Sequence, residues 1–307
     1  MAQRTFQRRT ILGGTLAAAA SILALPLQRA RAADSIAVPQ SMSLFTDTGP
    51  NVLVFGEGDS LVVVDSGAEV GGAMLMDYLK GLAPAGVPLL FNTHWHDEQT
   101  AGNEAFGNAG TRIIAHEKTR LRLATRYYLP QEQRYKLPAH AAACPTETFY
   151  SSGSLTAGGE TVDYGYLLQA HTDGDIYVHF RTANVLAVGD VVSPQRDPGF
   201  DWYGGGWLGG RVDAMDLLLE LANEDTLIVP AYGPVIGRAQ LQAERDLMAF
   251  LYEALVDQIR MGFSPQDSLD AGVMNGLARR WNDPYSFLYD AYKGLWGHHN
   301  TLAPELN

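Results

Sequence analysis

The strongest chemical signal in the chain is a pair of histidines two positions apart, His94 and His96, within residues 92–103. Side chains two positions apart in an extended segment point the same way, so both imidazoles could bind one metal ion. The apolar run Leu89–Phe91 before them is typical of a buried strand, and the polar run after them is typical of a loop. The spacing therefore predicts a metal site at the end of a strand, where open α/β sheets hold their ligands.

Three further potential ligands follow apolar runs in the same way. We interpret each run as a strand that ends in a ligand, which argues against a chance pairing of the two histidines. The additional ligands are His171 after residues 167–170, Asp190 after residues 185–189, and Tyr232 after residues 226–230.

Hydrophobic periodicity predicts the elements that must position these side chains. We expect hairpins over residues 52–64 and 176–188, and strands over residues 88–91, 112–115 and 226–229. Helices are predicted over residues 72–82 and 212–221 and around residues 247–259, while residues 117–145 should be helical at first and then irregular. Helices that cover two mixed sheets are the simplest packing of this order.

These motifs resemble the metallo-β-lactamase superfamily from about residue 45 to about residue 240. The family pattern is His-x-His-x-Asp-His, then a lone His, an Asp and a final His. The resemblance implies an α/β (α+β) fold, a four-layer αββα sandwich of two mixed β-sheets flanked by helices, with metal in a cleft at one edge. It places His94, His96 and His171 in the first metal site, and Asp190 on the aspartate that bridges or caps the second metal.

The second metal site departs from the family pattern at three positions. Glu98 stands where the family usually has Asp, Gln99 where it often has His, and Tyr232 where a final His is usual. A phenol has an ordinary pKa of about 10, so Tyr232 would bind metal well only when deprotonated. Oxygen ligands also suit Mn, Fe or Mg better than zinc. We therefore predict one firmly bound zinc and a second metal that is weak, absent or different, such as Mn or Fe.

Asp190 and Glu98 are predicted to orient a metal-activated water or to take its proton. Glu98 has two other interpretations, as a metal ligand or as a group that supports one. Gln99 is a weaker candidate ligand. Tyr232 could bind metal or substrate, donate a hydrogen bond to a developing oxyanion, or simply pack.

Aromatic residues gather in a glycine-rich loop at residues 201–210. Trp202, Tyr203 and Trp207 could form a pocket wall for an apolar or ring-bearing substrate. The alternative is a tight loop whose glycines only permit unusual backbone angles. The aromatic-rich tail, from about residue 242 to residue 307, is interpreted as a helical lid packed on the sandwich. No spacing ties the remaining histidines to the site: they are His116, His140, His179, His298 and His299.

Residues 1–32 differ in kind from the rest of the chain. Paired arginines at Arg8 and Arg9, an apolar Ala-rich stretch and a small-residue cleavage site at residues 30–32 predict a twin-arginine-type signal peptide. A membrane anchor is the alternative, but glycines and Pro26 interrupt the stretch. We therefore expect one metallo-β-lactamase-like domain over residues 33–307 and a periplasmic or secreted location.

The charge of the chain narrows the class of partner. Formal net charge is −12 over 307 residues; without the five arginines of residues 1–32, 17 basic residues stand against 34 acidic ones, a net charge of −17. Such a surface argues against nucleic-acid or anionic-membrane partners and leaves a small-molecule substrate. The lone Cys144 excludes an internal disulfide, and nothing in the sequence predicts the oligomeric state.

Taken together, the residues predict a periplasmic metal-dependent hydrolase that uses metal-activated water on an amide or lactam, an ester or a thioester. The altered second site makes efficient two-zinc lactam hydrolysis less favoured. Two alternatives remain: a non-catalytic metal- or ligand-binding protein on a degenerate hydrolase fold, and an accessory protein of a periplasmic redox enzyme.

Overall fold

The computed structural model describes residues 37–47, 49–130 and 132–301. The predicted signal segment, residues 1–32, lies outside this range.

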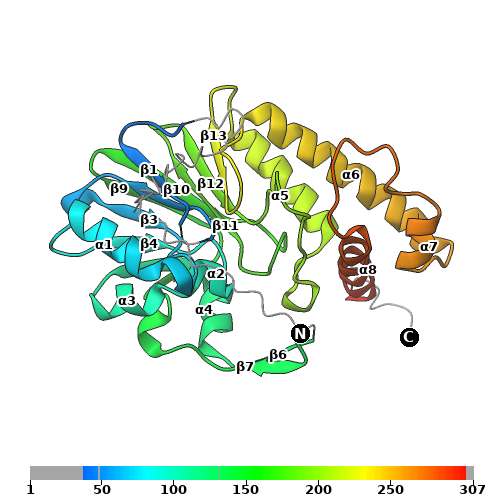
Figure 1. Ribbon diagram of the computed structural model, residues 1–307, viewed down its shortest axis with the longest axis horizontal. Helices are drawn as coiled ribbons and strands as arrows, with labels where there is room; N and C mark the ends of the chain where they lie inside the picture. Colours follow the sequence, from blue (N-terminus) through cyan, green and yellow to red (C-terminus); the bar gives the residue numbers. More distant parts are fainter. Residues whose placement is uncertain (1–36, 48, 131, 302–307) are drawn as a thin grey trace, which may run out of the picture. The chain divides into compact units, whose positions relative to one another are not determined.

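Six strands form the first sheet, in the order β1-β2-β3-β4-β5-β8. Figure 1 labels β1, β3 and β4 of this sheet. The pairs β1–β2 and β2–β3 are antiparallel, whereas β3–β4, β4–β5 and β5–β8 are parallel, so the sheet is mixed. The strands are β1 (Met42–Phe45), β2 (Val52–Phe55), β3 (Val62–Val64), β4 (Leu89–Phe91), β5 (Arg112–His116) and β8 (Glu147–Phe149).

Five strands form the second sheet, in the order β13-β12-β11-β10-β9. Only β12 and β13 run parallel, so this sheet is mixed as well. The strands are β9 (Ser152–Ala157), β10 (Glu160–Tyr166), β11 (Ile176–Phe180), β12 (Val185–Gly189) and β13 (Leu227–Pro230). A separate hairpin of β6 (Tyr127–Leu129) and β7 (Arg134–Lys136) lies in sequence between β5 and β8 of the first sheet.

Alternation of side chains along the strands divides the core into three layers. In β3, Val62 and Val64 belong to the cluster between the two sheets, while Val63 belongs to the cluster under the helices of the first sheet. In β12, Ala187 faces the first sheet and Leu186 faces the helices of the second. Each sheet is therefore apolar on both faces, which requires a helical layer on each outer side.

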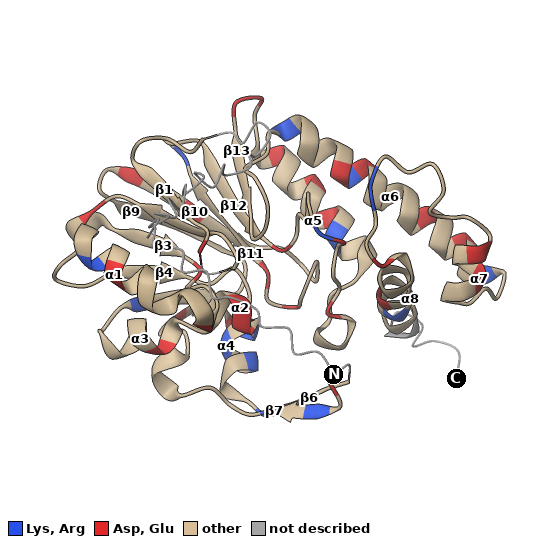
Figure 2. Ribbon diagram, in the orientation of Figure 1, with Lys and Arg blue, Asp and Glu red and all other residues tan. Residues whose placement is uncertain are grey.

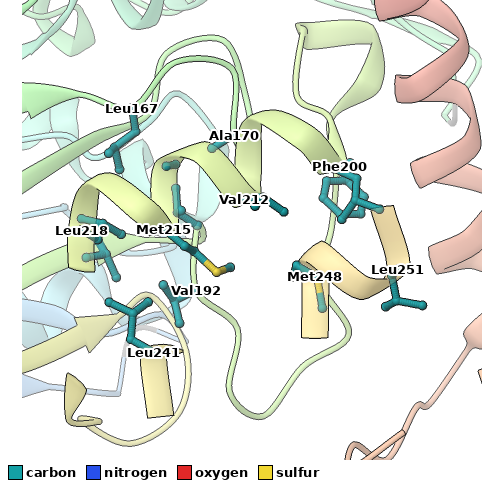
Figure 3. Close-up of a cluster of buried hydrophobic side chains, with 14 of the residues drawn as sticks. Leu167, Ala170, Val192, Phe200, Val212, Met215, Leu218, Leu241, Met248 and Leu251 are labelled. Carbon is teal, nitrogen blue, oxygen red and sulfur yellow. The ribbon is translucent and has the colours of Figure 1, made fainter. Parts of the chain in front are cut away.

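Helices supply those outer layers. Leu75 and Leu79 of α1 and Phe106 of α3 pack on the first sheet. The helices α5, α6 and α8 pack on the second sheet through a cluster that includes Met215 and Leu251 (Figure 3). The helices are α1 (Gly72–Leu82), α2 (Asp97–Thr100), α3 (Asn103–Asn108), α4 (Glu117–Ala124), α5 (Leu208–Leu221), α6 (Arg238–Arg260), α7 (Pro265–Asp270) and α8 (Pro284–Thr301). Short 3₁₀ turns occupy Gly58–Ser60, Glu69–Gly71, Ala141–Ala143 and Trp202–Gly204.

The four-layer αββα sandwich of two mixed sheets is thus confirmed, and so are the two predicted hairpins and the helix over residues 72–82. The strand predicted over residues 167–170 was wrong, because strand β10 ends at Tyr166 and residues 168–174 form turns. The sequence analysis also missed β1, β6, β7, β8, β9 and β10. Several of these carry polar residues on one face; β9, for example, alternates exposed and half-buried positions.

Acidic side chains are spread over the helices, and basic ones stand out on α4 and on the β6–β7 hairpin (Figure 2). Within the part of the chain that the structure describes, no helix is both long enough and apolar enough to cross a membrane.

Candidate metal centre

Three histidines from two loops converge at one edge of the sandwich. His94 and His96 follow β4, and His171 lies in the turns between β10 and β11. One ring nitrogen from each lies within 4.8 Å of the others. The Nδ1 of His96 and the Nε2 of His171 are 3.2 Å apart. Two nitrogen ligands of a tetrahedral zinc ion, each about 2.0–2.1 Å from the metal, would be separated by about 3.3 Å. The three rings are therefore spaced to hold one metal ion.

Hydrogen bonds at the opposite ring nitrogens of two histidines leave the converging nitrogens free. The Nε2 of His96 lies 2.9 Å from Oδ2 of Asp201, and the Nδ1 of His171 lies 2.9 Å from the carbonyl oxygen of Gly199. Because a carboxylate and a carbonyl only accept, each of these nitrogens must donate its N–H. The lone pairs at Nδ1 of His96 and Nε2 of His171 are thereby directed at the metal position.

His94 is held in the same way by a hydroxyl group. The Thr93 hydroxyl donates to Asp65 Oδ2 at 2.7 Å when that carboxyl is ionised, so it can accept the Nδ1–H of His94 at 3.2 Å. The Thr93 backbone N–H donates to the other oxygen of Asp65, also at 2.7 Å. The remaining His94 nitrogen, Nε2, is buried and has no hydrogen-bond partner among the described residues. An unpartnered buried imidazole nitrogen is what a metal ligand requires before its ion is added.

The electrostatic setting favours the neutral form of His94 and His171, which is the form that binds metal. Burial and the neighbouring histidines lower the pKa of His94 well below its usual range, and burial lowers that of His171 to about 4. Burial is the strongest single influence on His96 and acts to lower its pKa, but the hydrogen bond and charge of Asp201, together with the charges of Asp190 and Glu98, outweigh it, so the pKa is raised. His96 is the most exposed of the three, with 23% of its side chain accessible.

The turn that carries His171 is shaped by a buried carboxyl group. Asp175 accepts hydrogen bonds from the backbone N–H groups of His171 and Thr172 at 2.7 Å and from the Thr172 hydroxyl at 2.8 Å. Gly206 packs against the same turn so closely that a Cβ there would lie 2.0 Å from the His171 carbonyl oxygen. The position of the His171 ring is thus set by the contacts of its own backbone.

Asp190 reaches the site because a glycine precedes it. Gly189 has a φ of +57°, and a Cβ at this position would lie 2.8 Å from the Thr93 hydroxyl. A residue with a side chain would have to move the β12 end away from the loop that bears His94. In the observed arrangement Asp190 Oδ2 lies 3.7 Å from His94 Nε2, so the carboxylate borders the metal position.

The loop that supplies Gly199 and Asp201 is anchored by two arginines. Arg211, at the start of α5, is fully buried and donates to the Gly199 carbonyl at 3.2 Å and to the Ser193 hydroxyl at 2.8 Å. Arg279 donates to the Ser193 carbonyl at 2.5 Å and pairs with Glu244 at 2.7 Å. These contacts fix the backbone that holds two of the three histidines.

The other half of the cleft contains the residues of the predicted second metal site. A cavity of about 110 Å³ beside His96 and His171 is lined by Glu98, Asp190, Arg196 and Tyr232. The Gln99 side chain is fully buried, and its Nε2 donates to Asp190 Oδ2 at 3.0 Å. Among the described residues, the three histidines form the only group of three or more His, Cys, Asp or Glu side chains close enough together to share an ion. The side chains on this side of the cleft, Glu98, Gln99, Asp190 and Tyr232, therefore do not form a ligand set that fits a second metal ion.

The aromatic loop lines a different cavity. Trp202, Tyr203 and Trp207 border a space of about 360 Å³ together with the ion pair of Arg122 and Asp173. None of these aromatic residues lines the 110 Å³ cavity, whereas Tyr232 does. Their binding of substrate stays a prediction. The tail helix α8 reaches this loop, since the Trp207 ring stacks on that of His298 at a centroid distance of 3.6 Å.

The sequence analysis missed Asp201, Gly199, Thr93, Asp65 and Arg211 as groups that hold the histidines. Asp65 could have been found, because it follows an apolar strand as Asp190 does. Nothing in the spacing indicates Asp201, which lies 105 residues from His96.

Residues 45–231 match the model of the metallo-beta-lactamase superfamily, and the chain therefore belongs to that superfamily. Three solved structures show the same fold at identities below 20%. A metallo-beta-lactamase from Pontibacter korlensis superposes with a TM-score of 0.55 and 18% identity, covering 70% of this chain and 98% of its own. The B3 metallo-beta-lactamase BLEG-1 superposes with a TM-score of 0.55 and 19% identity, covering 67% of this chain and 99% of its own.

The third structure is the stereoselective inverting sec-alkylsulfatase Pisa1 from Pseudomonas sp., with a TM-score of 0.63 and 15% identity. It covers 89% of this chain, which spans about half of the sulfatase (51%). A search of curated proteins finds no match.

Proposed function

We propose that this protein is an exported hydrolase that binds one metal ion, preferably zinc, at His94, His96 and His171. The observation that carries the proposal is the convergence of three imidazoles, each with its other nitrogen held by a hydrogen-bond acceptor. Three neutral nitrogen ligands with room for a fourth are the arrangement of catalytic zinc sites.

A bound metal ion would supply Lewis acidity and lower the pKa of water. The chain's own groups then divide the remaining work. Asp190 has one oxygen 3.7 Å from His94 Nε2, so it can orient a water at the metal position and accept its proton. The amide of Gln99 holds that carboxylate in place from a buried position.

Tyr232 is placed to assist the substrate. Burial raises the pKa of its phenol, so the O–H stays protonated at neutral pH and can donate to a developing negative oxygen. Glu98 is exposed and lines the cavity, where it can contact solvent or a ligand. We include amides, lactams, esters and thioesters among the substrates, and add sulfate esters because a sulfatase shares the fold.

Metal content tests the first part of the proposal. The purified protein, dialysed against zinc and then against buffer, should retain one equivalent. His171→Ala should lose it, whereas His140→Ala should not, because 62% of the His140 side chain is exposed and it lies outside the cluster. Retention of zinc by His171→Ala would contradict the proposed ligand set.

A substrate panel tests the second part. Zinc-, manganese- and iron-loaded protein would be assayed on lactam, ester, thioester and sulfate ester compounds. Hydrolysis of one class that disappears on metal removal and returns on metal addition supports the proposal. Metal uptake with no turnover on any class would favour the alternative of a metal- or ligand-binding protein. The specific observation behind that alternative is the absence of the second-site histidines at Gln99 and Tyr232.

Export is the third part and rests on the sequence of residues 1–32 alone. Replacing Arg8 and Arg9 by lysine should leave the precursor inside the cytoplasm if a twin-arginine signal directs it. Cell fractionation of the two forms measures this, and unchanged export of the double-lysine variant would count against that route.

A further inference from the structure

The half of the cleft beyond the histidines is filled by the chain's own hydrogen-bond donors. The Gln99 amide turns its N–H group to Asp190 Oδ2 at 3.0 Å, and the whole side chain is buried. A metal ion bound to Asp190 Oδ2 would meet this N–H group in place of a ligand lone pair. The Gln99 Oε1 is also buried and has no hydrogen-bond partner among the described residues. Gln99 therefore replaces a ligand by a donor.

A positive charge lies on the same side. The Arg196 guanidinium stacks on the Tyr232 ring, 3.7 Å from its centroid, and both residues line the 110 Å³ cavity. The Tyr232 phenol is neutral at ordinary pH because burial raises its pKa. A second divalent cation beside Tyr232 would meet a neutral phenol and a like charge instead of an anionic ligand.

Hydrogen bonds hold the backbone around Arg196, and among the described residues the charge of its side chain is not paired with a carboxylate. Its carbonyl oxygen accepts a hydrogen bond from Arg279, and the next residue, Asp197, accepts the backbone N–H groups of Asn282 and Asp283. Asp197 is thus engaged elsewhere. In the described ranges, no ion pair joins the Arg196 side chain to a carboxylate. The guanidinium lines the cavity and contacts the Tyr232 side chain, and its remaining N–H groups can donate to a ligand.

We propose that Arg196 takes the place of the second metal ion, so that the cleft combines one metal with one guanidinium and selects ligands that carry a carboxylate or sulfate next to the group that meets the metal. A planar guanidinium offers paired N–H donors that match such anions. Where the ligand is the substrate, this inference rests on the proposed function; the binding preference itself does not.

Two hydroxamates, used as metal-binding ligands and not as substrates, probe this preference for a second anionic group. Acetohydroxamate and the monohydroxamate of succinic acid share a metal-binding group and differ by one carboxylate. Their affinities for zinc-loaded protein are measured by calorimetry. In the wild type the carboxylate should improve binding about tenfold or more, the effect of a hydrogen bond to a charged group.

Substitutions identify the residue responsible. Arg196→Ala should abolish the preference for the charged probe, and Arg196→Lys should keep part of it. Arg280→Ala removes the same charge from an exposed position on another cavity and should leave the preference unchanged. Zinc titration of the wild type should saturate at one equivalent.

An equal preference in Arg196→Ala and wild type would overturn the inference, and so would a second tightly bound zinc. Because the probes report binding without turnover, a protein that hydrolyses nothing but shows the Arg196-dependent preference would contradict the proposed function and support this inference.

Discussion

The two halves of the cleft are built on opposite principles. On the histidine side, every ring is fixed by a partner at its far nitrogen and keeps its near nitrogen free. On the other side, the Gln99 amide nitrogen donates to Asp190, and the Arg196 guanidinium stacks on the Tyr232 ring. Free lone pairs that converge can bind a metal ion, whereas N–H groups that point at a carboxylate or into the cavity cannot. The comparison shows that a ligand set is defined as much by what its members already bind as by residue type.

The largest effect is expected from removing a ligand on the histidine side. His171→Ala should weaken zinc binding by more than about 100-fold, since even loss of a group that only supports a ligand costs about 10–100-fold. Zinc affinity is measured by competition with a chromophoric chelator. An affinity like that of the wild type would place the metal elsewhere and break the comparison.

Exchange of Asp190 should separate the roles of the two carboxylates. Asp190→Asn should lower kcat by about 100-fold or more with little change in KM, the contribution of a positioned general base. Glu98→Gln should lower it by less than about tenfold, because Glu98 is exposed and lies outside the ion-sharing cluster. A larger effect on kcat at Glu98 than at Asp190 would show that Glu98, and not Asp190, accepts the proton.

Asp201 tests whether the far-side hydrogen bonds matter. Asp201→Asn leaves the shape of the loop but removes the charge that faces His96, and should cost about 10–100-fold in metal affinity. Asp197→Asn is the matched control, since Asp197 lies on the same loop but binds the backbone of residues 282–283. It should lower stability with little effect on metal affinity. Equal losses of affinity would mean that the loop acts only through its fold.

The smallest expected effect is at Gly189. Gly189→Ala should destabilise the metal-free protein by about 1–3 kcal/mol, because a side chain there is strained at positive φ and approaches Thr93. Gly262 also has positive φ but open space around it, so Gly262→Ala should cost only about 1–2 kcal/mol. Urea unfolding measures both. A Gly189 variant that is no less stable than the Gly262 variant would show that the close approach to Thr93 carries no cost.

The sequence predicted the layers of the fold because hydrophobic periodicity survives in buried strands. The run 61–64 and the run 185–188 alternate between two apolar layers and were identified as strands. Strand β9 was missed because it alternates exposed and half-buried positions, and β10 was missed because Glu160, Thr161 and Asp163 interrupt its apolar residues.

The candidate ligands could also be predicted from the sequence, since each of His94, His96 and Asp190 follows a strand closely. The residues that hold these ligands in place could not. Asp201 meets His96 only after the chain has formed four strands of the second sheet, β9 to β12. Arg196 meets Tyr232 across 36 residues with no shared motif. Side-chain contacts between loops depend on tertiary packing, which a local pattern does not encode.

Zinc stoichiometry of the wild-type protein tests the central claim most directly. After saturation with zinc and removal of excess, metal analysis should give one ion per chain. Two ions would show that the Gln99 and Arg196 side accepts a metal after all, and none would show that the three converging imidazoles do not form a binding site.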